Sequence, residues 1–429
     1  MIHKLKHETY CRLIAAGAAV LTSGALAQQP GAYSPSADAA AEAPSQSQYS
    51  PTGTAPALAR DSSQRGGIPL GPITAYPSIQ AGLQHNDNLY SNPNNKSSDW
   101  IRVAIPAVRF EARQAANTYS LFLGSTLGRY QTHTADDYTS YNASGLADLD
   151  LSTRLRAKLR ADYIDSIDPR GSTNNAISAT PDRWHQTTGQ GLISYGAPGA
   201  RGRVDFDLGE TRRWYVNNLA TTQSNDRTTD NIGATFYWRI APKTSLLFQG
   251  VHTKIDYWQS TSTMDSTENR LLAGATWEAT AKTSGRFGLG VVKKDFADPA
   301  RSDFTGVTWD GQIRWSPLSY SNVNFNLSKG PVETTGGVGN FIDRTTTAAL
   351  WTHEWSSQIT TDASASYISD VYHGLDRTDN TENFGIKATY KMRRWLSFSG
   401  DYTHTFRNSN DNTFDYKRNV FMLYLRAAL

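Results

Sequence analysis

Apolar and polar residues alternate along most of this chain, from about Thr74 to its last residue, Leu429. In the clearest segment, 155–161, leucine and alanine occupy every second position, and arginine or lysine occupies the positions between. A period of two places these two sets on opposite faces of a β-strand, whereas a helix would spread the basic residues around its cylinder. The pattern therefore predicts a long series of amphipathic strands.

The connections between these segments are alternately short and long. Eight short connections are expected near the following residues: Gln114, Ser152, Pro198, Pro242, Lys282, Pro317, Ser357 and Met392. Nine longer polar stretches lie between them, at 86–98, 131–137, 165–183, 217–228, 259–267, 297–303, 330–341, 372–380 and 408–415. Together they join about 18 strands, with 16 as the alternative because the first strand and the region 330–345 are weakly patterned. The predicted fold is all-β, an antiparallel up-and-down transmembrane β-barrel over residues 74–429 whose short turns face the periplasm.

The composition separates a membrane barrel from other β proteins. Hydrophobic residues make up only 38% of the chain and the mean hydropathy is −0.52, yet the chain contains 11 Trp and 21 Tyr. This balance suits strands with one face toward lipid and the other toward water. A soluble sandwich or propeller is the alternative, but it would need a second protein layer over the apolar face. No stretch after the N-terminus is apolar over the length that a membrane-spanning helix requires, so no such helix is predicted.

The N-terminus has the features of a secretory signal peptide. A basic start is followed by an apolar run at 13–26 and by the small-residue cleavage site Ala25-Leu26-Ala27, so residues 1–27 are predicted to be removed. An uncleaved membrane anchor is the alternative, although the apolar run is short for one. Residues 28–73 are rich in Ala, Ser, Pro, Gln and Gly and are predicted to form a flexible leader. Cys11, the only cysteine, precedes the cleavage site, so no disulfide is expected.

Motifs that would indicate an enzyme or a metal site are missing from the sequence. It has no H-E-x-x-H, no G-x-S-x-G and no P-loop, and its 9 His are scattered. A hydrolase built from a Ser–His pair across strands remains an alternative that spacing alone does not exclude. The formal net charge of +3 gives no global argument for nucleic-acid binding. We expect no catalytic residue, no cofactor, no metal and no nucleic-acid partner.

Charged residues on the polar face of the strands are the candidate functional residues. A hairpin that turns near Ser152 is expected to bring two acids close to a basic column, and a third segment repeats the mixed charges. The predicted lumen-facing set is Arg154, Arg156, Lys158, Arg160, Asp148, Asp150, Arg203, Asp205 and Asp207. These charges either pair with one another and hydrate the wall, or form a track that guides a polar or anionic solute. Amide and hydroxyl groups at Asn322, Asn324, Asn326, Ser397, Ser399 and Thr403 suit hydroxyl-rich ligands and are also what a wet wall contains.

Tryptophans gather near the short connections, where they are expected to form a ring at one membrane interface. Indole is half apolar and half polar, so it is favoured at the boundary between lipid and water. The predicted girdle is Trp238, Trp277, Trp315, Trp355 and Trp395. The chain also ends on an alternating strand, 421–429, which is similar to the C-terminal signal of outer-membrane proteins, although Leu429 replaces the usual aromatic residue.

The layout resembles the outer-membrane β-barrel proteins of exopolysaccharide and capsule loci, the EpsL-like or β-barrel porin type 2 family. The resemblance would cover about residues 74–429 and rests on these segments: Tyr76-Pro77-Ser78-Ile79, Gly82-Leu83-Gln84-His85-Asn86-Asp87-Asn88-Leu89-Tyr90, Ile105-Pro106-Ala107 and Tyr119-Ser120-Leu121. The resemblance implies passage of a nascent polysaccharide across the outer membrane, alongside periplasmic polysaccharide-export proteins. It implies no catalytic residue.

Three roles in the bacterial outer membrane follow as expectations. The first is a β-barrel porin that passes a secreted exopolysaccharide, with outer-membrane lipid and the polymer as its partners. The second is a general diffusion porin for small polar solutes, because a barrel of 16 to 18 strands can leave an aqueous channel. The third is a closed structural or surface-binding barrel. The leader or an infolded loop such as 165–183 could plug the lumen in any of them.

Overall fold

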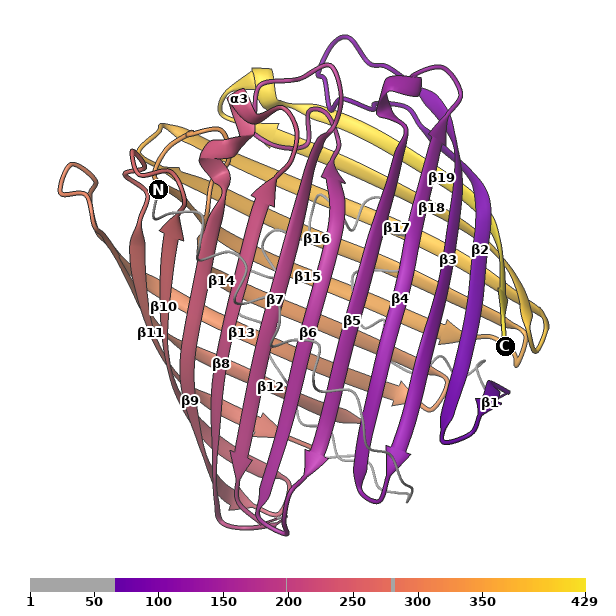
Figure 1. The fold of residues 1–429 in the computed structure, drawn as a ribbon, viewed down its shortest axis with the longest axis vertical. Coiled ribbons are helices and arrows are strands. Elements are labelled where there is room, and N and C mark those ends of the chain that lie inside the picture. The colour runs from indigo at the N-terminus through magenta and orange to yellow at the C-terminus, as the bar shows by residue number, and fades with distance from the viewer. Residues whose placement is uncertain (1–65, 198, 279–281) are drawn as a thin grey trace, which may run out of the picture.

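The computed structural model describes residues 66–197, 199–278 and 282–429. Eighteen long antiparallel strands, β2 to β19, each pair with the next along the chain. The last strand closes the sheet on the first, with Val420 opposite Asn86 and Ala428 opposite Ser78 (Figure 1). The predicted all-β, up-and-down barrel is therefore confirmed, with 18 strands and not 16.

The strands are of similar length, and three short helical turns and one helix lie in the loops. The barrel strands are β2 (Ile73–Asn86), β3 (Asp99–Gln114), β4 (Asn117–Tyr130), β5 (Tyr138–Asp150), β6 (Leu155–Asp168), β7 (Asp182–Tyr195), β8 (Gly202–Tyr215), β9 (Arg227–Ala241), β10 (Thr244–Tyr257), β11 (Ser266–Trp277), β12 (Thr283–Phe296), β13 (Phe304–Leu318), β14 (Ser321–Val332), β15 (Phe341–Glu354), β16 (Ile359–His373), β17 (Arg377–Arg393), β18 (Leu396–Ser409) and β19 (Tyr416–Ala428). The loops contain η1 (Thr134–Asp136), α3 (Leu219–Thr222), η2 (Gln223–Asn225) and η3 (Asn412–Phe414). No helix in the described part of the chain is long and apolar enough to cross a membrane.

The predicted signal peptide, and the predicted leader up to residue 65, lie outside the described residues. The last residues of the segment predicted as a leader have regular structure, since β1 (Ile68–Leu70) pairs with the start of β2. Strand β2 itself begins at Ile73, close to the position at which the alternation begins in the sequence.

Short and long connections alternate as the sequence predicts, with small shifts. Pro317 and Met392 were expected at turns, but they lie inside β13 and β17, and the turns follow at 319–320 and 394–395. The largest difference between a predicted and an observed connection is at 372–380, where the loop consists only of residues 374–376. It is shorter because Tyr372 pairs with Arg377, which extends both strands. Hairpin pairing here prevails over the polar character of the sequence, since each added pair satisfies backbone groups.

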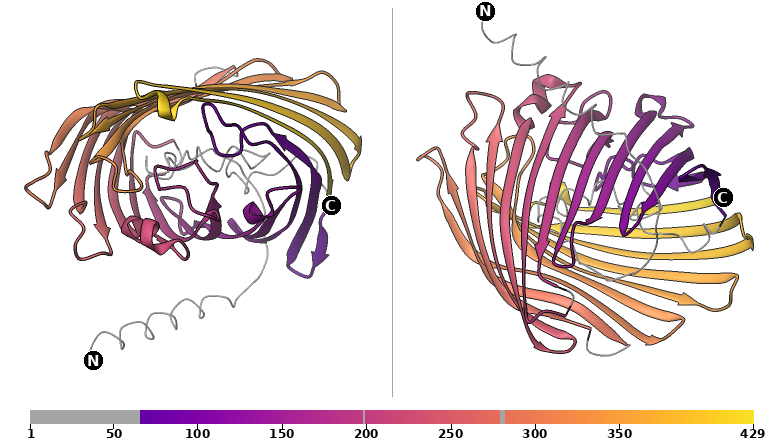
Figure 2. Two further views of the ribbon diagram at one scale, coloured as in Figure 1. Left: turned by 90° about the horizontal axis from the view of Figure 1, so that it is seen from above. Right: turned by 60° about the horizontal axis from the view of Figure 1, so that its bottom comes forward.

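The two faces of the strands differ as a membrane barrel requires. Apolar side chains on the outer face remain about half exposed, for example Leu159 at 50%, Leu208 at 56% and Leu289 at 51%. No protein layer covers them in the described part of the chain, and such a face is stable only against lipid. The strands' other face is turned to the lumen, where side chains such as Asp205, Arg286 and Lys294 are only 7%, 6% and 0% exposed. Figure 2 shows the two walls of the barrel facing each other across this lumen.

A charge placed on the two faces is expected to have very different effects on stability. Leu289→Arg puts a guanidinium into lipid near the middle of β12 and is expected to cost about 2–4 kcal/mol of unfolding free energy. Asn326→Arg, on the lumen face of β14, is the matched control and is expected to cost less than about 1 kcal/mol. Urea unfolding of the protein refolded into bilayers measures both, and equal costs would contradict the assignment of the faces.

Candidate functional site

The charged column of β6 faces the lumen and meets acids of its own hairpin. Arg156 Nε lies 3.4 Å from Asp150 Oδ1, and Lys158 Nζ lies 3.4 Å from Asp148 Oδ2. These pairs face each other across the β5–β6 register, which places Asp148 opposite Lys158 and Asp150 opposite Arg156. The column is therefore partly neutralised by the neighbouring strand.

The third basic residue of the column pairs along its own strand. Arg160 Nε donates a hydrogen bond of 2.6 Å to Asp162 Oδ2, two residues further along β6. Arg154 was expected to complete the column on the lumen face, but it lies in the turn before β6, which begins at Leu155, and its side chain is exposed. The strand begins one residue later than the alternation suggests because the backbone at 152–154 bends to close the hairpin.

The mixed charges of β8 also point into the lumen. Arg203 Nε lies 3.1 Å from Asp205 Oδ1, and the Arg203 guanidinium stacks 4.1 Å from the centre of the Tyr237 ring on β9. The Asp207 carboxylate lies over Gly233, where a Cβ would come within 2.5 Å of Oδ2. Glycine at 233 thus leaves room for this carboxylate to lie along the wall.

The opposite wall combines uncharged polar groups with ion pairs such as Lys387 with Asp362. On β14, Asn322, Asn324 and Asn326 lie on one face, and the Asn324 amide donates to Asn322 Oδ1 at 3.2 Å. Ser399 on β18 bonds with Thr389 on β17 at 3.0 Å. Ser397 and Thr403 share the face of Ser399 on the same strand. Such groups exchange hydrogen bonds with water and with solute hydroxyls at little cost.

The five tryptophans of the predicted girdle all lie at or next to the short-turn ends of their strands. Trp238, Trp315, Trp355 and Trp395 are between 38% and 62% exposed, and Trp277 is partly exposed. At the loop end of the outer face, a second aromatic row joins His185, Trp214 and Trp258, with Trp214 and Trp258 stacked 6.0 Å apart. The lipid-facing surface is thus bordered by aromatic rings at both ends.

The loop between β6 and β7, residues 169–181, crosses the external mouth of the barrel, and we call it the strap. One end is fixed to the loop between β4 and β5 by Arg170, which donates to Asp136 Oδ1 at 2.7 Å and to Oδ2 at 2.6 Å. Tyr90 Oη also donates to Asp136 at 2.8 Å. Burial and this hydrogen bond raise the pKa of Tyr90 to about 12, so its phenol stays protonated and keeps donating at any physiological pH.

The middle of the strap, at Asn174, reaches the far wall. Arg377 on β17 donates to Asn174 Oδ1 at 3.0 Å, and Asn174 Nδ2 donates to the Tyr372 hydroxyl on β16 at 3.4 Å. The backbone amide of Asn174 donates to Thr335 Oγ1 in the loop between β14 and β15 at 3.1 Å. Strands β16 and β17 lie across the lumen from β6 and β7, and Figure 2 shows magenta loop segments within the outline of the barrel.

Two glycines allow the strap to pack closely against neighbouring loops. Gly171 has φ +76°, and a Cβ there would lie 2.2 Å from the carbonyl oxygen of Tyr90. Gly336 has φ +69°, and a Cβ there would lie 2.6 Å from the carbonyl oxygen of Asn174. Only glycine tolerates both the positive φ and the contact. Both attachments of the strap, near its β6 end and at Asn174, therefore depend on glycine where backbones touch.

A buried lysine ties the loop 333–340 to the wall beneath the strap. Lys294 on β12 is fully buried, and its Nζ donates to Glu268 Oε1 at 2.8 Å and to Glu333 Oε1 at 2.7 Å. The Tyr257 hydroxyl donates to the other oxygen of Glu333 at 2.6 Å. Burial alone would raise the pKa of Glu333, but Lys294 and Arg227 outweigh it and lower the value. Glu333 therefore stays ionised and holds its loop in place.

A second buried cluster stiffens the wall next to the strap. Asp168, at the end of β6, accepts hydrogen bonds from Trp184 Nε1 at 2.9 Å and from the Tyr215 hydroxyl at 2.8 Å. The Arg213 guanidinium lies 3.3 Å from the same carboxylate and 3.9 Å from the Trp184 ring centre. Asp168 is the last residue before the strap, so this cluster fixes the point from which the strap leaves the wall.

The sequence alone does not reveal the clusters at Asp136, Lys294 and Asp168. Their members come from strands and loops far apart in the chain, and nothing in the local pattern of Arg170 or Glu333 marks a partner. The one available signal is that successive side chains of a strand point to opposite faces of the sheet. Lys293 and Lys294 are adjacent in a strand, so one of them has to face the lumen. No group of three or more His, Cys, Asp or Glu that could hold a metal ion occurs among the described residues.

Comparison with known proteins adds a family match and several similar folds. A family model described as "Putative beta-barrel porin 2" matches residues 62–429. Among solved structures, Pseudomonas aeruginosa OprD is 13% identical, with a TM-score of 0.43 over 83% of this chain and 95% of that chain. Acinetobacter baumannii OccAB3 is 9% identical, with a TM-score of 0.45 over 83% and 99%. A BenF-like porin from Pseudomonas fluorescens is 11% identical, with a TM-score of 0.46 over 83% and 99%. No curated protein matches the chain.

Proposed function

The chain belongs to the beta-barrel porin 2 family, whose members are porin barrels of the bacterial outer membrane. On this basis, we propose that it admits small polar solutes through a lumen that is narrowed at its external mouth. The observation that carries the proposal is the strap, which is bonded to Asp136 on one side and to Tyr372 and Arg377 on the other. A segment held across the mouth narrows the passage, so compact solutes should pass more easily than a continuous polymer, which would have to displace it.

The wall of the lumen supports passage of polar solutes of either charge. Its basic residues near the short turns are paired with acids, as at Arg156 with Asp150 and Lys158 with Asp148, so no strong field of one sign develops there. The barrel removes the hydrocarbon barrier, and the wall groups replace part of the water around the solute. Amide and hydroxyl groups on β14 and β18 offer these contacts without binding tightly enough to slow release.

Passage of a polysaccharide is the second candidate function, and one observation favours it. The row of Asn322, Asn324 and Asn326 on β14, together with Ser399 on β18, presents uncharged hydrogen-bonding groups that suit sugar hydroxyls. This role requires the strap to move aside, and it would bring periplasmic polysaccharide-export proteins as partners. The third candidate, a closed surface-binding barrel, requires the strap and its neighbouring loops to block the lumen completely.

Uptake of sugars of increasing chain length separates the three candidates. The refolded mature protein in vesicles is expected to conduct ions and to admit monosaccharides quickly, with uptake falling steeply as the sugar chain lengthens. Equal uptake of long and short sugars would favour polymer passage, and loss of secreted polymer on gene deletion would support it independently. Absence of both conductance and sugar uptake would favour the closed barrel.

The paired basic column makes a specific prediction about ion selectivity. Replacing Arg156, Lys158 and Arg160 together by alanine removes the cations beside Asp150, Asp148 and Asp162 and is expected to shift permeability toward cations by about threefold. Reversal potentials under a salt gradient measure the shift. A matched variant that also converts the three aspartates to asparagine is expected to restore the original selectivity, and an unchanged ratio in the triple variant would rule out an influence of this column.

A further inference from the structure

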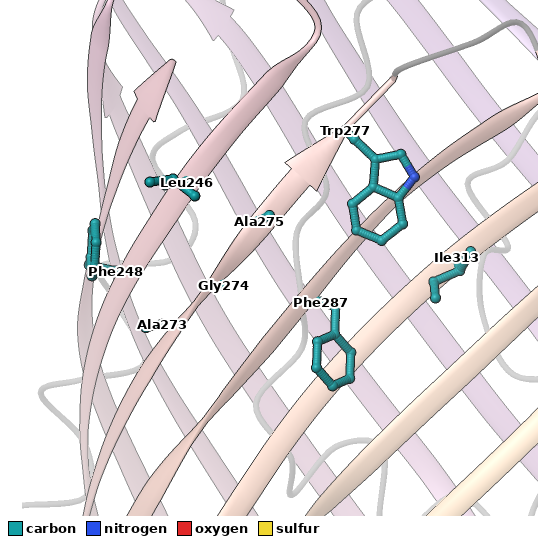
Figure 3. Close-up of a pocket in the computed structure, with 8 residues that line it drawn as sticks. All are labelled: Leu246, Phe248, Ala273, Gly274, Ala275, Trp277, Phe287 and Ile313. Carbon is teal, nitrogen blue, oxygen red and sulfur yellow. The ribbon is translucent and has the colours of Figure 1, made fainter. Parts of the chain in front are cut away.

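The lipid-facing surface of β10 to β13 contains an apolar groove. It is open to the outside, has a volume of about 670 Å³ and is lined by Leu246, Phe248, Ala273, Gly274, Ala275, Trp277, Phe287 and Ile313. Figure 3 shows the ring of Trp277 and the ring of Phe287 beside the small residues of β11.

The strand register explains why the surface is hollow here. Ala275 lies opposite Leu246 on β10 and opposite Phe287 on β12, so a methyl group separates two large side chains. Ala273, two residues earlier on the same face, lies opposite Phe248 and Leu289 in the same way. Two alanines on one strand between larger residues on both neighbours make a channel that runs along β11. An occupant over β11 would contact the larger side chains of β10 and β12 as well as the alanines beneath it.

The groove opens toward the short-turn end of the barrel, which faces the periplasm in outer-membrane barrels. Trp277 is the last residue of β11, and the next backbone amide, that of Glu278, donates to the carbonyl oxygen of Lys243 at 2.8 Å. Lys243 lies in the turn between β9 and β10, and its side chain is exposed. Glu278 is also exposed, so the end of the groove has one cationic side chain, Lys243, and one acidic side chain, Glu278.

We propose that this groove holds one acyl chain of a glycerophospholipid from the periplasmic leaflet, with the lipid phosphate near Lys243. The groove is continuous with the lipid-facing belt, so an acyl chain reaches it without crossing water or protein. The lining is almost wholly apolar, which matches a hydrocarbon chain, and its one side-chain hydrogen-bond donor is the indole N–H of Trp277 at the end of the groove. The lysine at the end of the groove, level with the interfacial Trp277, supplies the complementary charge for a phosphodiester.

Photolabelling in a bilayer tests the assignment. The refolded protein is placed in vesicles of phosphatidylethanolamine and phosphatidylglycerol that contain a phosphatidylglycerol with a photoreactive acyl chain. Adducts mapped by mass spectrometry are expected to favour Phe248 over Phe206 by about tenfold, the equivalent of about two methylene groups held in the groove. These two phenylalanines are matched in exposure, at 51% and 53%, but Phe206 lies on β8 outside the groove.

Three variants connect the labelling to the groove. Ala275→Phe fills the floor and is expected to lower groove adducts about tenfold, whereas Ala161→Phe, on the lipid face of β6, is the control and leaves them unchanged. Lys243→Gln is expected to lower them about fivefold, as loss of one lysine near anionic lipid predicts. If Ala275→Phe does not fold, as judged by heat-modified gel mobility, Ala275→Val is used instead, because its smaller side chain fills less of the groove.

Several outcomes would overturn the proposal. Even labelling of Phe248 and Phe206, or equal labelling in Ala275→Phe and the native chain, would show an ordinary lipid-facing surface. Protection of the groove from lipid, together with chemical cross-linking of two chains through β11, would assign the groove to contact with a second copy. Conductance is recorded on the same samples, so a failure of solute passage is distinguished from a failure of lipid binding.

Discussion

Asp136→Asn is expected to release one end of the strap and to increase both the mean conductance of the channel and its fluctuations. The substitution removes a carboxylate that accepts two hydrogen bonds from Arg170, at 2.7 and 2.6 Å, and one from Tyr90. Loss of charge-assisted hydrogen bonds of this kind weakens an attachment by about 1.5–3 kcal/mol. The population with a displaced strap should therefore rise about ten- to a hundredfold.

Single-channel recording of the refolded protein measures this change, and limited proteolysis within 169–181 gives an independent readout of a freed loop. Arg212→Gln is the control, because it breaks an exposed ion pair with Glu210 on the outer face, where both side chains are about half exposed. Exposed pairs of this kind contribute little. If Asp136→Asn and Arg212→Gln behave like the native channel, the strap does not limit the mouth and the proposed size selection loses its basis.

Lys294→Met is expected to destabilise the barrel by about 3–5 kcal/mol, because it leaves Glu268 and Glu333 as facing buried carboxylates without their shared cation. The lysine is fully buried and its Nζ lies 2.8 Å from one carboxylate and 2.7 Å from the other. The urea midpoint of the folded barrel in bilayers measures the loss. Adding Glu333→Gln to the lysine variant is expected to recover part of it, since one buried charge is then removed.

Lys254→Met is the matched control for this experiment. Lys254 also pairs with a carboxylate, at 2.7 Å from Asp256, but both side chains are exposed on the outer face. Its loss is expected to have no measurable effect on the urea midpoint. A small effect of Lys294→Met, equal to that of Lys254→Met, would contradict the view that Lys294 holds the loop 333–340 against the wall.

Acid should weaken the same attachment. The pKa of Glu333 is lower in the folded protein than its ordinary value, because Lys294 and Arg227 outweigh the effect of burial. A carboxyl of this kind contributes stability that is present above its ordinary pKa and is lost as the pH falls through the lowered folded value. The native barrel is therefore expected to lose stability in acid, whereas a Glu333→Gln variant should lose less over the same range.

Period-two patterning makes the strands and their faces predictable from the sequence. In 155–161 it assigns Leu159 to lipid and Lys158 to the lumen, and the structure has both on these faces. Turn positions are less certain, as at Met392, where the strand continues past the expected turn to Arg393. A residue near the end of a hairpin can pair or turn at similar cost, so local composition does not decide the boundary.

The contacts at the mouth could not be predicted in the same way. Asn174 contacts Arg377 across 203 positions of sequence, and Arg170 contacts Asp136, which lies in the short helical turn η1, across 34 positions. Loop conformations depend on tertiary partners and not on a repeating pattern. The sequence therefore indicates that 165–183 is long enough to fold inward, but it does not indicate what the loop would bind.

The seam between β19 and β2 has a consequence for how the molecule is assembled. It joins the two ends of the sheet, so that Asn419 bonds with Asp87, 332 positions earlier in the chain. Until β19 pairs with β2, both edge strands of the sheet have unpaired backbone amide and carbonyl groups, which can pair with any other extended polypeptide. Closure that depends on such distant segments is slow by its nature. The nascent chain thus needs protection during its transit of the periplasm, and truncation by a single terminal strand should yield aggregates rather than a smaller ring.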